Sequence, residues 1–185
     1  MINRFVRTPP LDSTAYPNQA KMLLFGFSIE RATDDWVPIN DVVMGGVSAG
    51  RLEATGNDTV AFTGLVSLNN NGGFASVRSR PGKHDLGGYS GLELRFRGDG
   101  RRYKINLKTD LRADGILYRA VFETREDEWQ ALRLPFEDFL PTFRGRFASK
   151  LPGSEPTRTR AATRPFFESN LPPPSNSSMN PMLGF

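Results

Sequence analysis

Alternating apolar and polar positions mark the middle of the chain as β-structure. In residues 92–97, Leu, Leu and Phe alternate with Glu, Arg and Arg, and residues 103–108 repeat the pattern with Tyr, Ile and Leu. A period of two places the apolar side chains of a strand on one face. Gly98-Asp99-Gly100 separates the two runs, and glycine tolerates the positive φ of a tight turn. We therefore expect residues 92–108 to form a β-hairpin with one buried and one solvated face.

Several further segments have the length and composition of strands. They are short, contain β-branched or aromatic residues and are bounded by turn-forming residues: residues 51–54, 60–66, 74–79, 117–124 and 129–134. Turn signals that recur about every 8 to 12 residues are typical of sandwiches and jelly rolls. Residues 135–139 are expected to form one or two helical turns, and no long helix is predicted. The expected fold class is all-β: an antiparallel β-sandwich or jelly roll.

Pattern and composition divide the chain into three zones. Residues 1–22 are polar and interrupted by proline, and we interpret them as a poorly ordered leader. Residues 23–146 carry the alternation and are the predicted sandwich. Residues 147–185 hold seven of the 14 prolines, including Pro172-Pro173-Pro174, which has no N–H to give to a β-ladder. We interpret this zone as a disordered or divergent tail.

Composition excludes several classes of protein. The 185 residues contain no cysteine, which removes disulfides, thiolate metal sites and cysteine nucleophiles. The formal net charge is +4, from 24 basic and 20 acidic residues. Nucleic-acid binding requires basic residues clustered on one face, and a basic excess of this size is more typical of a solubility feature. No apolar run approaches the roughly 20 residues of a membrane span. The first 22 residues lack the apolar region of a signal peptide.

Candidate catalytic residues are few. His84, the single histidine, lies in a polar turn, and no nucleophile-elbow spacing accompanies it. The acidic runs Asp34-Asp35 and Glu126-Asp127-Glu128 have the composition of exposed turns more than of cation sites. One enzymatic hypothesis stays open, a carboxylate-dependent enzyme such as a glycosidase, which would need two acidic side chains in one pocket. We expect no enzymatic activity, no cofactor and no metal.

Two glycine-rich segments stand out instead, residues 36–48 and 69–78. Neither matches a phosphate loop, because no Lys-Ser or Lys-Thr follows the glycines. Paired glycines permit close backbone approach and positive φ, and neighbouring Asn and Asp side chains cap free backbone groups. On the structural interpretation both segments are interlocking turns at one end of the sandwich; on the functional interpretation they form a binding rim. The two interpretations are compatible.

An ordered set of motifs resembles one protein family. The motifs are Trp36 with residues 40–48, residues 70–78, residues 98–104, Tyr118, Phe122, Trp129, residues 134–136 with Phe139, and residues 141–146. Together they resemble the complex I intermediate-associated protein 30 family over residues 23–146. The resemblance implies a galactose-binding-like jelly roll, similar in architecture to carbohydrate-binding modules. It also implies a non-catalytic role as an assembly factor or chaperone for respiratory complex I (NADH:ubiquinone oxidoreductase).

The chain departs from the family pattern after Arg146. Residues 147–185 do not resemble the strands that would close the sandwich, so we expect the fold to lack its closing C-terminal strand or strands. A disrupted reading frame near Phe147 is one hypothesis for the difference, and divergence into a tail is the other.

The expected partner-binding residues are the polar and glycine positions of the two glycine-rich segments. They are Asn40, Asp41, Met44, Gly45, Gly46, Asn70, Gly72, Gly73 and Arg78. The expected partner is a protein, of the class of complex I subunits or assembly intermediates, with no nucleic acid and no membrane span. The expected location is the cytoplasm of a bacterium or the mitochondrial matrix of a eukaryote.

The alternative function is a carbohydrate-binding module. Such a module stacks exposed aromatic rings on sugars, and Trp36, Trp129 and Tyr103 are the candidates. Tyr103 and Trp129 are instead expected in the core, Tyr103 because it shares a strand face with Ile105 and Leu107.

Overall fold

The fold is built almost entirely from short strands. A computed structural model describes residues 4–7, 21–27, 33–56, 58–82, 84–110, 115–144, 146–148, 164–169, 178–179 and 182–183. The strands are β1 (Arg4–Arg7), β2 (Lys21–Leu23), β3 (Trp36–Pro38), β4 (Ala49–Gly56), β5 (Thr59–Leu65), β6 (Ala75–Ser79), β7 (Tyr89–Arg97), β8 (Arg102–Lys108), β9 (Leu117–Glu123), β10 (Trp129–Pro135), β11 (Leu140–Phe143), β12 (Arg146–Phe147), β13 (Arg164–Ser169), β14 (Ser178–Met179) and β15 (Met182–Leu183).

Three 3₁₀ turns are the helical elements of the described residues: η1 (Asp41–Met44), η2 (Asn69–Asn71) and η3 (Phe136–Asp138). The third lies where the sequence predicts a short helical turn. Within the ranges that the structure describes, no helix has the length and apolar character needed to cross a membrane.

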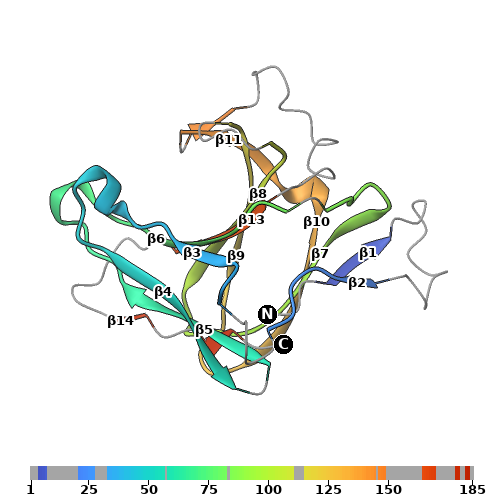
Figure 1. Ribbon diagram of the computed structural model, residues 1–185, viewed down its shortest axis with the longest axis horizontal. Helices are drawn as coiled ribbons and strands as arrows, with labels where there is room; N and C mark the ends of the chain where they lie inside the picture. Colours follow the sequence, from blue (N-terminus) through green and yellow to red (C-terminus); the bar gives the residue numbers. More distant parts are fainter. Residues whose placement is uncertain are drawn as a thin grey trace.

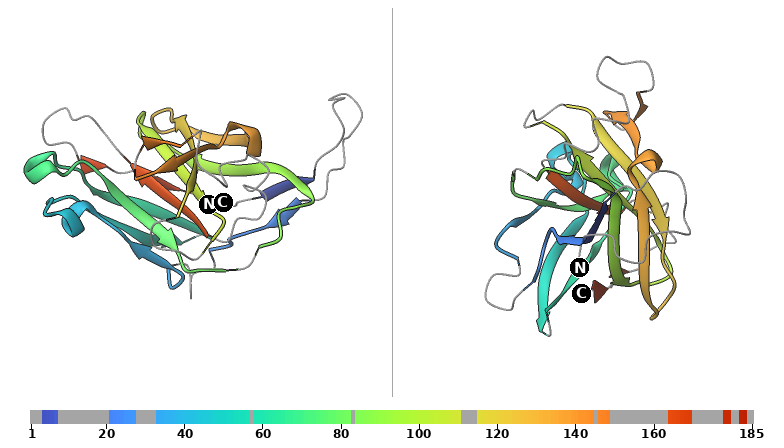
Figure 2. Two further views of the ribbon diagram at one scale, coloured as in Figure 1. Left: turned by 90° about the horizontal axis from the view of Figure 1, so that it is seen from above. Right: turned by 90° about the vertical axis from the view of Figure 1, so that its right-hand side faces the viewer.

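The strands form three antiparallel sheets (Figures 1 and 2). One sheet has the order β10-β7-β1-β2, and the largest has the order β12-β11-β9-β8-β13-β6-β3. In the third sheet, β5 pairs with β4, β14 and β15. The predicted all-β, antiparallel class is therefore confirmed, and each of the five further predicted strand segments overlaps an observed strand.

All three sheets contribute to one hydrophobic core. Phe96 of β7 packs on Phe122 of β9, with ring centroids 5.2 Å apart. Tyr103 of β8 approaches both Phe122, at 6.1 Å, and Phe62 of β5, at 6.5 Å. These rings are buried together with the other alternating apolar positions of β7 and β8, Leu92, Leu94, Ile105 and Leu107. Burial of aliphatic and aromatic side chains on this scale is the main source of stability.

The expected hairpin of residues 92–108 is not formed. Strand β7 pairs with β10 and β1, whereas β8 pairs with β9 and β13, so residues 98–101 carry the chain from one sheet to another. The alternation correctly identifies which face of each strand is buried. It does not identify the neighbouring strand, because two strands on opposite sides of a core have the same pattern as two neighbours in one sheet.

Half of the face of β8 that points away from the core is also buried, contrary to the expectation of a solvated face. Asn106 and Lys108 are buried on it. Arg119 Nε donates a hydrogen bond to Asn106 Oδ1 at 2.8 Å, and Lys108 Nζ forms an ion pair with Asp110 at 3.2 Å. Partners of this kind make the burial of polar side chains tolerable.

The tail after Phe147 contributes strands, which corrects the expectation that the sandwich lacks its closing strand. Strand β13 lies between β8 and β6 in the middle of the seven-stranded sheet. Strand β1, in the expected leader, pairs with β7 and β2. Alternation does not reveal β13, because its six residues (RPFFES) begin with Arg-Pro and run two phenylalanines together. The limits of the three zones otherwise stay a prediction.

Candidate functional site

The first glycine-rich segment forms a tight turn around η1. Asp41 begins η1, and Gly45 ends it with φ at 88°, a conformation that glycine adopts without strain. The N–H of Gly45 donates to the carbonyl of Val42 at 3.0 Å, and the N–H of Gly46 donates to the carbonyl of Asp41 at 3.0 Å. The chain then turns back toward β4.

The side chain of Asp41 ties the two glycine-rich segments together. The residue is fully buried. Its Oδ1 accepts a hydrogen bond from the N–H of Ser48 at 2.8 Å, and its Oδ2 accepts one from the hydroxyl of Ser48. The same Oδ2 accepts hydrogen bonds from the N–H of Gly73 at 2.7 Å and of Phe74 at 3.3 Å. One carboxylate thus supplies acceptors to backbone donors that are 32 and 33 residues away in sequence.

The glycines beside Asp41 are required by the space around its carboxylate. A Cβ atom on Gly46 would overlap the carboxyl group of Asp41. A Cβ atom on Gly72 would lie 2.5 Å from Asp41 Oδ2 and 2.7 Å from the carbonyl oxygen of Ser67. Each Gly-Gly pair therefore combines one residue with positive φ, Gly45 or Gly73, and one that packs directly against the carboxylate.

The environment of Asp41 favours its ionised form. Burial alone would raise the pKa of this carboxyl group, but the hydrogen bonds from Ser48, Gly73 and Phe74 outweigh it and hold the pKa below its ordinary value of 3.8. Asp41 is consequently a charged and fully hydrogen-bonded group at neutral pH.

Two more contacts complete this arrangement. Ser48 Oγ accepts a hydrogen bond from the N–H of Ser67 at 3.0 Å. The side chain of Asn40 forms two bonds with Gly50, donating to its carbonyl at 3.3 Å and accepting from its N–H at 3.1 Å. We call residues 40–48 and 65–74 the rim, and we call the contacts of Asp41 with Ser48, Gly73 and Phe74 the aspartate lock. Figures 1 and 2 show η1 and η2 side by side at one end of the molecule.

The structural interpretation of the glycine-rich segments as interlocking turns is therefore correct. The predicted site residues divide into two groups. Asp41 and Gly73 form the lock, Gly46 and Gly72 pack against the Asp41 carboxylate, and Asn40 holds Gly50 through two hydrogen bonds. Met44, Gly45 and Asn70 are exposed, and Asn70 adopts a left-handed conformation with φ at 55° within η2.

Arg78 does not belong to the rim. It lies within β6, half-buried, and its Cα is paired with Val37 of β3 and Phe166 of β13. Strand alternation from Ala75 onward would have indicated this position, because Ala75 and Val77 face the core on the same strand.

The aromatic residues considered for carbohydrate binding are not gathered on one exposed face. Trp36 and Tyr103 are buried in the core. Trp129 is 44% exposed, so its expected place in the core is wrong, and the guanidinium of Arg95 lies over its ring at 5.2 Å.

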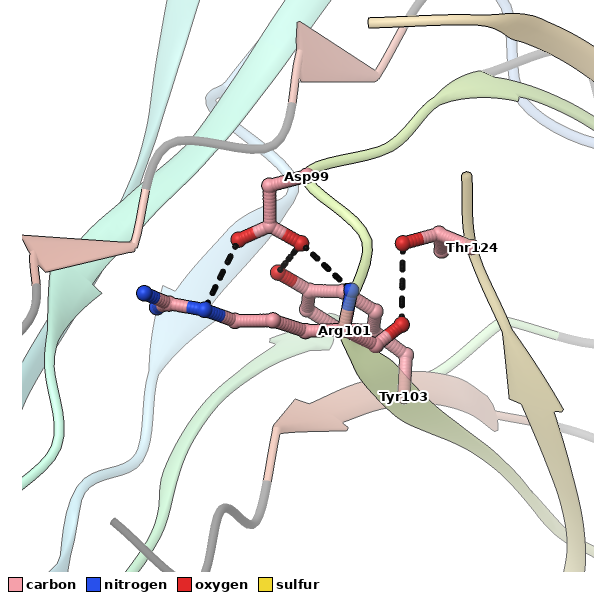
Figure 3. A network of polar contacts seen from close by, with 4 residues as sticks. All are labelled: Asp99, Arg101, Tyr103 and Thr124. Atoms are coloured by element: carbon pink, nitrogen blue, oxygen red, sulfur yellow. Dashed lines mark hydrogen bonds and ion pairs between the residues drawn. The ribbon is translucent and has the colours of Figure 1, made fainter. Parts of the chain in front are cut away.

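A second polar network, which the sequence patterns do not reveal, stabilises the crossing from β7 to β8 (Figure 3). Asp99 Oδ1 accepts hydrogen bonds from the hydroxyl of Tyr103 at 3.0 Å and from the N–H of Arg101 at 3.2 Å. Thr124 Oγ1 donates to the carbonyl of Arg101 at 2.8 Å. Burial raises the pKa of Tyr103, and the negative charge of Asp99 and its hydrogen bond raise it further, so Tyr103 stays a neutral donor.

The expected catalytic candidates do not assemble into a site. His84 is half-buried with its ring 5.8 Å from that of Phe25, and burial lowers its pKa. The acidic runs near residues 34 and 126 are exposed. Within the described ranges, no three His, Cys, Asp or Glu side chains are grouped so that they could hold a metal ion.

Comparison with known proteins gives two kinds of match. The sequence model of the family described as "Complex I intermediate-associated protein 30 (CIA30)" matches residues 25–161. The mitochondrial complex I intermediate-associated protein 30 of Drosophila melanogaster is 28% identical over 144 residues, which is 67% of this chain and 49% of the relative. The chain thus spans about half the length of this relative.

Among solved structures, the family 11 carbohydrate-binding module of the cellulosomal cellulase Lic26A-Cel5E of Clostridium thermocellum superposes with a TM-score of 0.54. The superposition has 12% identity and covers 81% of this chain and 84% of the module. A family 11 module from the same organism, in complex with a β-1,3-1,4-mixed-linked tetrasaccharide, gives a TM-score of 0.53 at 12% identity, covering 100% of this chain and 94% of the module. At this identity the likeness concerns the jelly-roll fold alone.

Proposed function

The chain belongs to the complex I intermediate-associated protein 30 family, and on that premise we propose that it is a non-catalytic binding protein that acts as an assembly factor or chaperone for complex I. Its partners would be complex I subunits or assembly intermediates. The observation that carries this proposal is the match of the family model to residues 25–161, which include the whole rim.

The rim has the physical properties of a binding surface. The aspartate lock holds two loops in one conformation, so little conformational entropy is lost when a partner binds. We propose that the exposed residues Met44, Gly45 and Asn70 contact the partner. Asn40, Asp41, Gly46, Gly72 and Gly73 would act by shaping the loops. Arg78 is not included, because it lies in β6 away from this surface.

Carbohydrate binding is the weaker alternative. It is supported by the shared jelly-roll fold, since the two superposed modules are carbohydrate-binding proteins. It is opposed by the burial of Trp36 and Tyr103, which leaves neither ring free to stack on a sugar. In a eukaryote we propose the mitochondrial matrix as the location, as the name of the Drosophila relative suggests, and in a bacterium the cytoplasm.

Affinity capture from the protein's own cells tests the proposal. The tagged full-length chain is expected to enrich complex I subunits over a tag-only control, and to migrate with a complex I subassembly in native gels. Deletion of the gene should lower the amount of assembled complex I. Normal complex I content in the deletion strain, together with no enrichment of its subunits, would show that the proposal is wrong.

A further inference from the structure

Exposed apolar side chains are concentrated on the rim. Eleven large hydrophobic residues of the described ranges are exposed, and five of them lie in residues 40–48 and 65–74: Val42, Met44, Val47, Leu65 and Leu68. Val42 and Met44 are the most exposed of the five, at 63% and 62%. Apolar residues gathered on one surface, in contrast to single ones scattered over it, indicate a site of interaction with another macromolecule.

The two segments of the rim lie against each other. Asp41 bonds to the N–H of Gly73, and Leu68 packs over Gly73, with its Cδ2 3.0 Å from where a Cβ of that glycine would be. The apolar side chains in and after η1 and those that precede η2 therefore belong to one surface.

The described residues of the rim carry no exposed charge. Residues 42–50 and 65–74 contain no Asp, Glu, Lys, Arg or His, and the one ionised residue of the rim, Asp41, is buried and fully hydrogen-bonded. A charged side chain of a partner would find no counter-charge here, and burying it unpaired would be unfavourable. An apolar side chain would instead remove both its own surface and that of Met44 or Val42 from water.

Amide groups stand beside the apolar side chains. Asn69 and Asn70 are exposed in η2. Their side chains have both donors and acceptors, which suits the backbone of a bound segment without requiring charge on it.

From these observations we propose that the rim binds an uncharged, apolar segment of a partner protein, with Val42, Met44, Val47 and Leu68 as the contacts that supply most of the affinity. This proposal rests on the proposed function, because it names the chemistry of the partner that an assembly factor would hold. It extends the contact from Met44 to the neighbouring apolar side chains Val42, Val47 and Leu68.

Site-specific photo-crosslinking tests the proposal. The photoreactive residue p-benzoyl-phenylalanine is incorporated at Met44 of the full-length chain, and at Val121 as a matched control, because Val121 is an exposed apolar residue of β9 outside the rim. After irradiation in the protein's own cells, mass spectrometry identifies the crosslinked peptides. We expect position 44, and not position 121, to crosslink to an uncharged, predominantly apolar segment.

Variants and salt provide a second measurement. Met44→Asp and Leu68→Asp should each lower capture of the crosslinked partner by about tenfold or more, since each places an unpaired carboxylate in the apolar contact. Val121→Asp should leave capture unchanged. Capture by the unaltered chain should also persist between roughly 0.05 and 0.5 M salt, because screening weakens charge–charge contacts and not apolar ones. Circular dichroism checks that each variant is folded.

Each outcome is decisive. Crosslinks from position 44 to an apolar segment of a protein unrelated to complex I would retain the proposed surface and reject the proposed function. Crosslinks to a charged segment of a complex I subunit, or capture of such a subunit that salt abolishes, would retain the proposed function and reject the proposed apolar contact. Crosslinks only to a second copy of this chain, or none at position 44, would overturn the proposed surface.

Discussion

Removal of the Asp41 carboxylate is predicted to destabilise the fold strongly. In Asp41→Ala the buried N–H group of Ser48 and the partly buried N–H groups of Gly73 and Phe74 lose their acceptor. A buried donor left without a partner costs about 1–3 kcal/mol. Two of the three bonds are short, at 2.8 and 2.7 Å, and that of Phe74 is long, at 3.3 Å. We therefore expect the free energy of unfolding to fall by about 3–5 kcal/mol, allowing for partial relaxation of the loops.

A conservative replacement separates hydrogen bonding from shape. Asp41→Asn keeps one acceptor oxygen, which can occupy the Oδ2 position that serves Gly73 and Phe74. Its NH₂ group then faces the N–H of Ser48 and one hydrogen bond is lost. The expected loss is about 1–2 kcal/mol, smaller than that of the alanine variant.

Urea unfolding followed by tryptophan fluorescence measures these losses, and an unchanged denaturant slope indicates that stability alone has changed. Asp35→Ala is the matched control, because Asp35 is an exposed aspartate close in sequence and its replacement should change the free energy by less than about 0.5 kcal/mol. If Asp41→Ala is as stable as this control, the aspartate lock does not hold the two segments of the rim together.

Three further predictions concern the charge of Asp41, the glycines beside it and the aromatic core. The pKa of Asp41 is lower in the folded than in the unfolded chain, so its ionisation contributes to the free energy of unfolding. This contribution is complete above about pH 4 and is lost as the pH falls through the folded pKa. The free energy of unfolding should therefore fall less steeply with acidification in Asp41→Asn than in the unaltered chain. In urea titration, Gly46→Ala should lower the free energy of unfolding by more than Gly45→Ala does. The added Cβ at position 46 overlaps Asp41, whereas the one at position 45 meets no atom within 4 Å and costs about 1 kcal/mol for the positive φ. Equal losses in the two variants would contradict this. Trp36→Ala should lower the free energy of unfolding by about 3–5 kcal/mol and Trp129→Ala by less than about 1 kcal/mol, as their burial differs; calorimetry that ranks them in the opposite order would refute the assigned core.

The sequence predicts which residues enter the core better than it predicts which strands are neighbours. Leu92, Leu94 and Phe96 are buried as their alternation requires, because a period of two depends only on local backbone geometry. Pairing depends on contacts between residues far apart in sequence. Local pattern therefore does not show that β7 leaves its sheet at Gly98, nor that β13 enters the other sheet between β8 and β6.

Within the rim, the sequence identifies Asp41 and its neighbouring glycines but not their separate roles, nor the exposed side chains of Val42, Val47 and Leu68. Asp and Gly close together indicate turns, and the structure contains those turns. The sequence does not show that Asp41 is buried or that it accepts hydrogen bonds from the second segment. Both depend on a contact between residues 32 positions apart. The sequence groups Arg78 with the rim because it ends the second glycine-rich segment, residues 69–78, whereas in the structure it lies in β6, within the sheet.

The structural role of the lock also makes the exposed apolar residues of the rim easier to interpret. Asp41, Gly46 and Gly72 have contacts that the fold requires, and their presence needs no partner to explain it. Val42 and Met44 differ, because each leaves more than half of its side chain in water and would be replaceable by a polar residue without loss to the core. Folding does not require apolar side chains at these two exposed positions of an uncharged turn, and their exposure increases the tendency to aggregate. A contact with an apolar partner would explain the exposure of these two side chains. Met44→Asp is therefore expected to weaken binding and leave folding intact, whereas Asp41→Ala is expected to disrupt both.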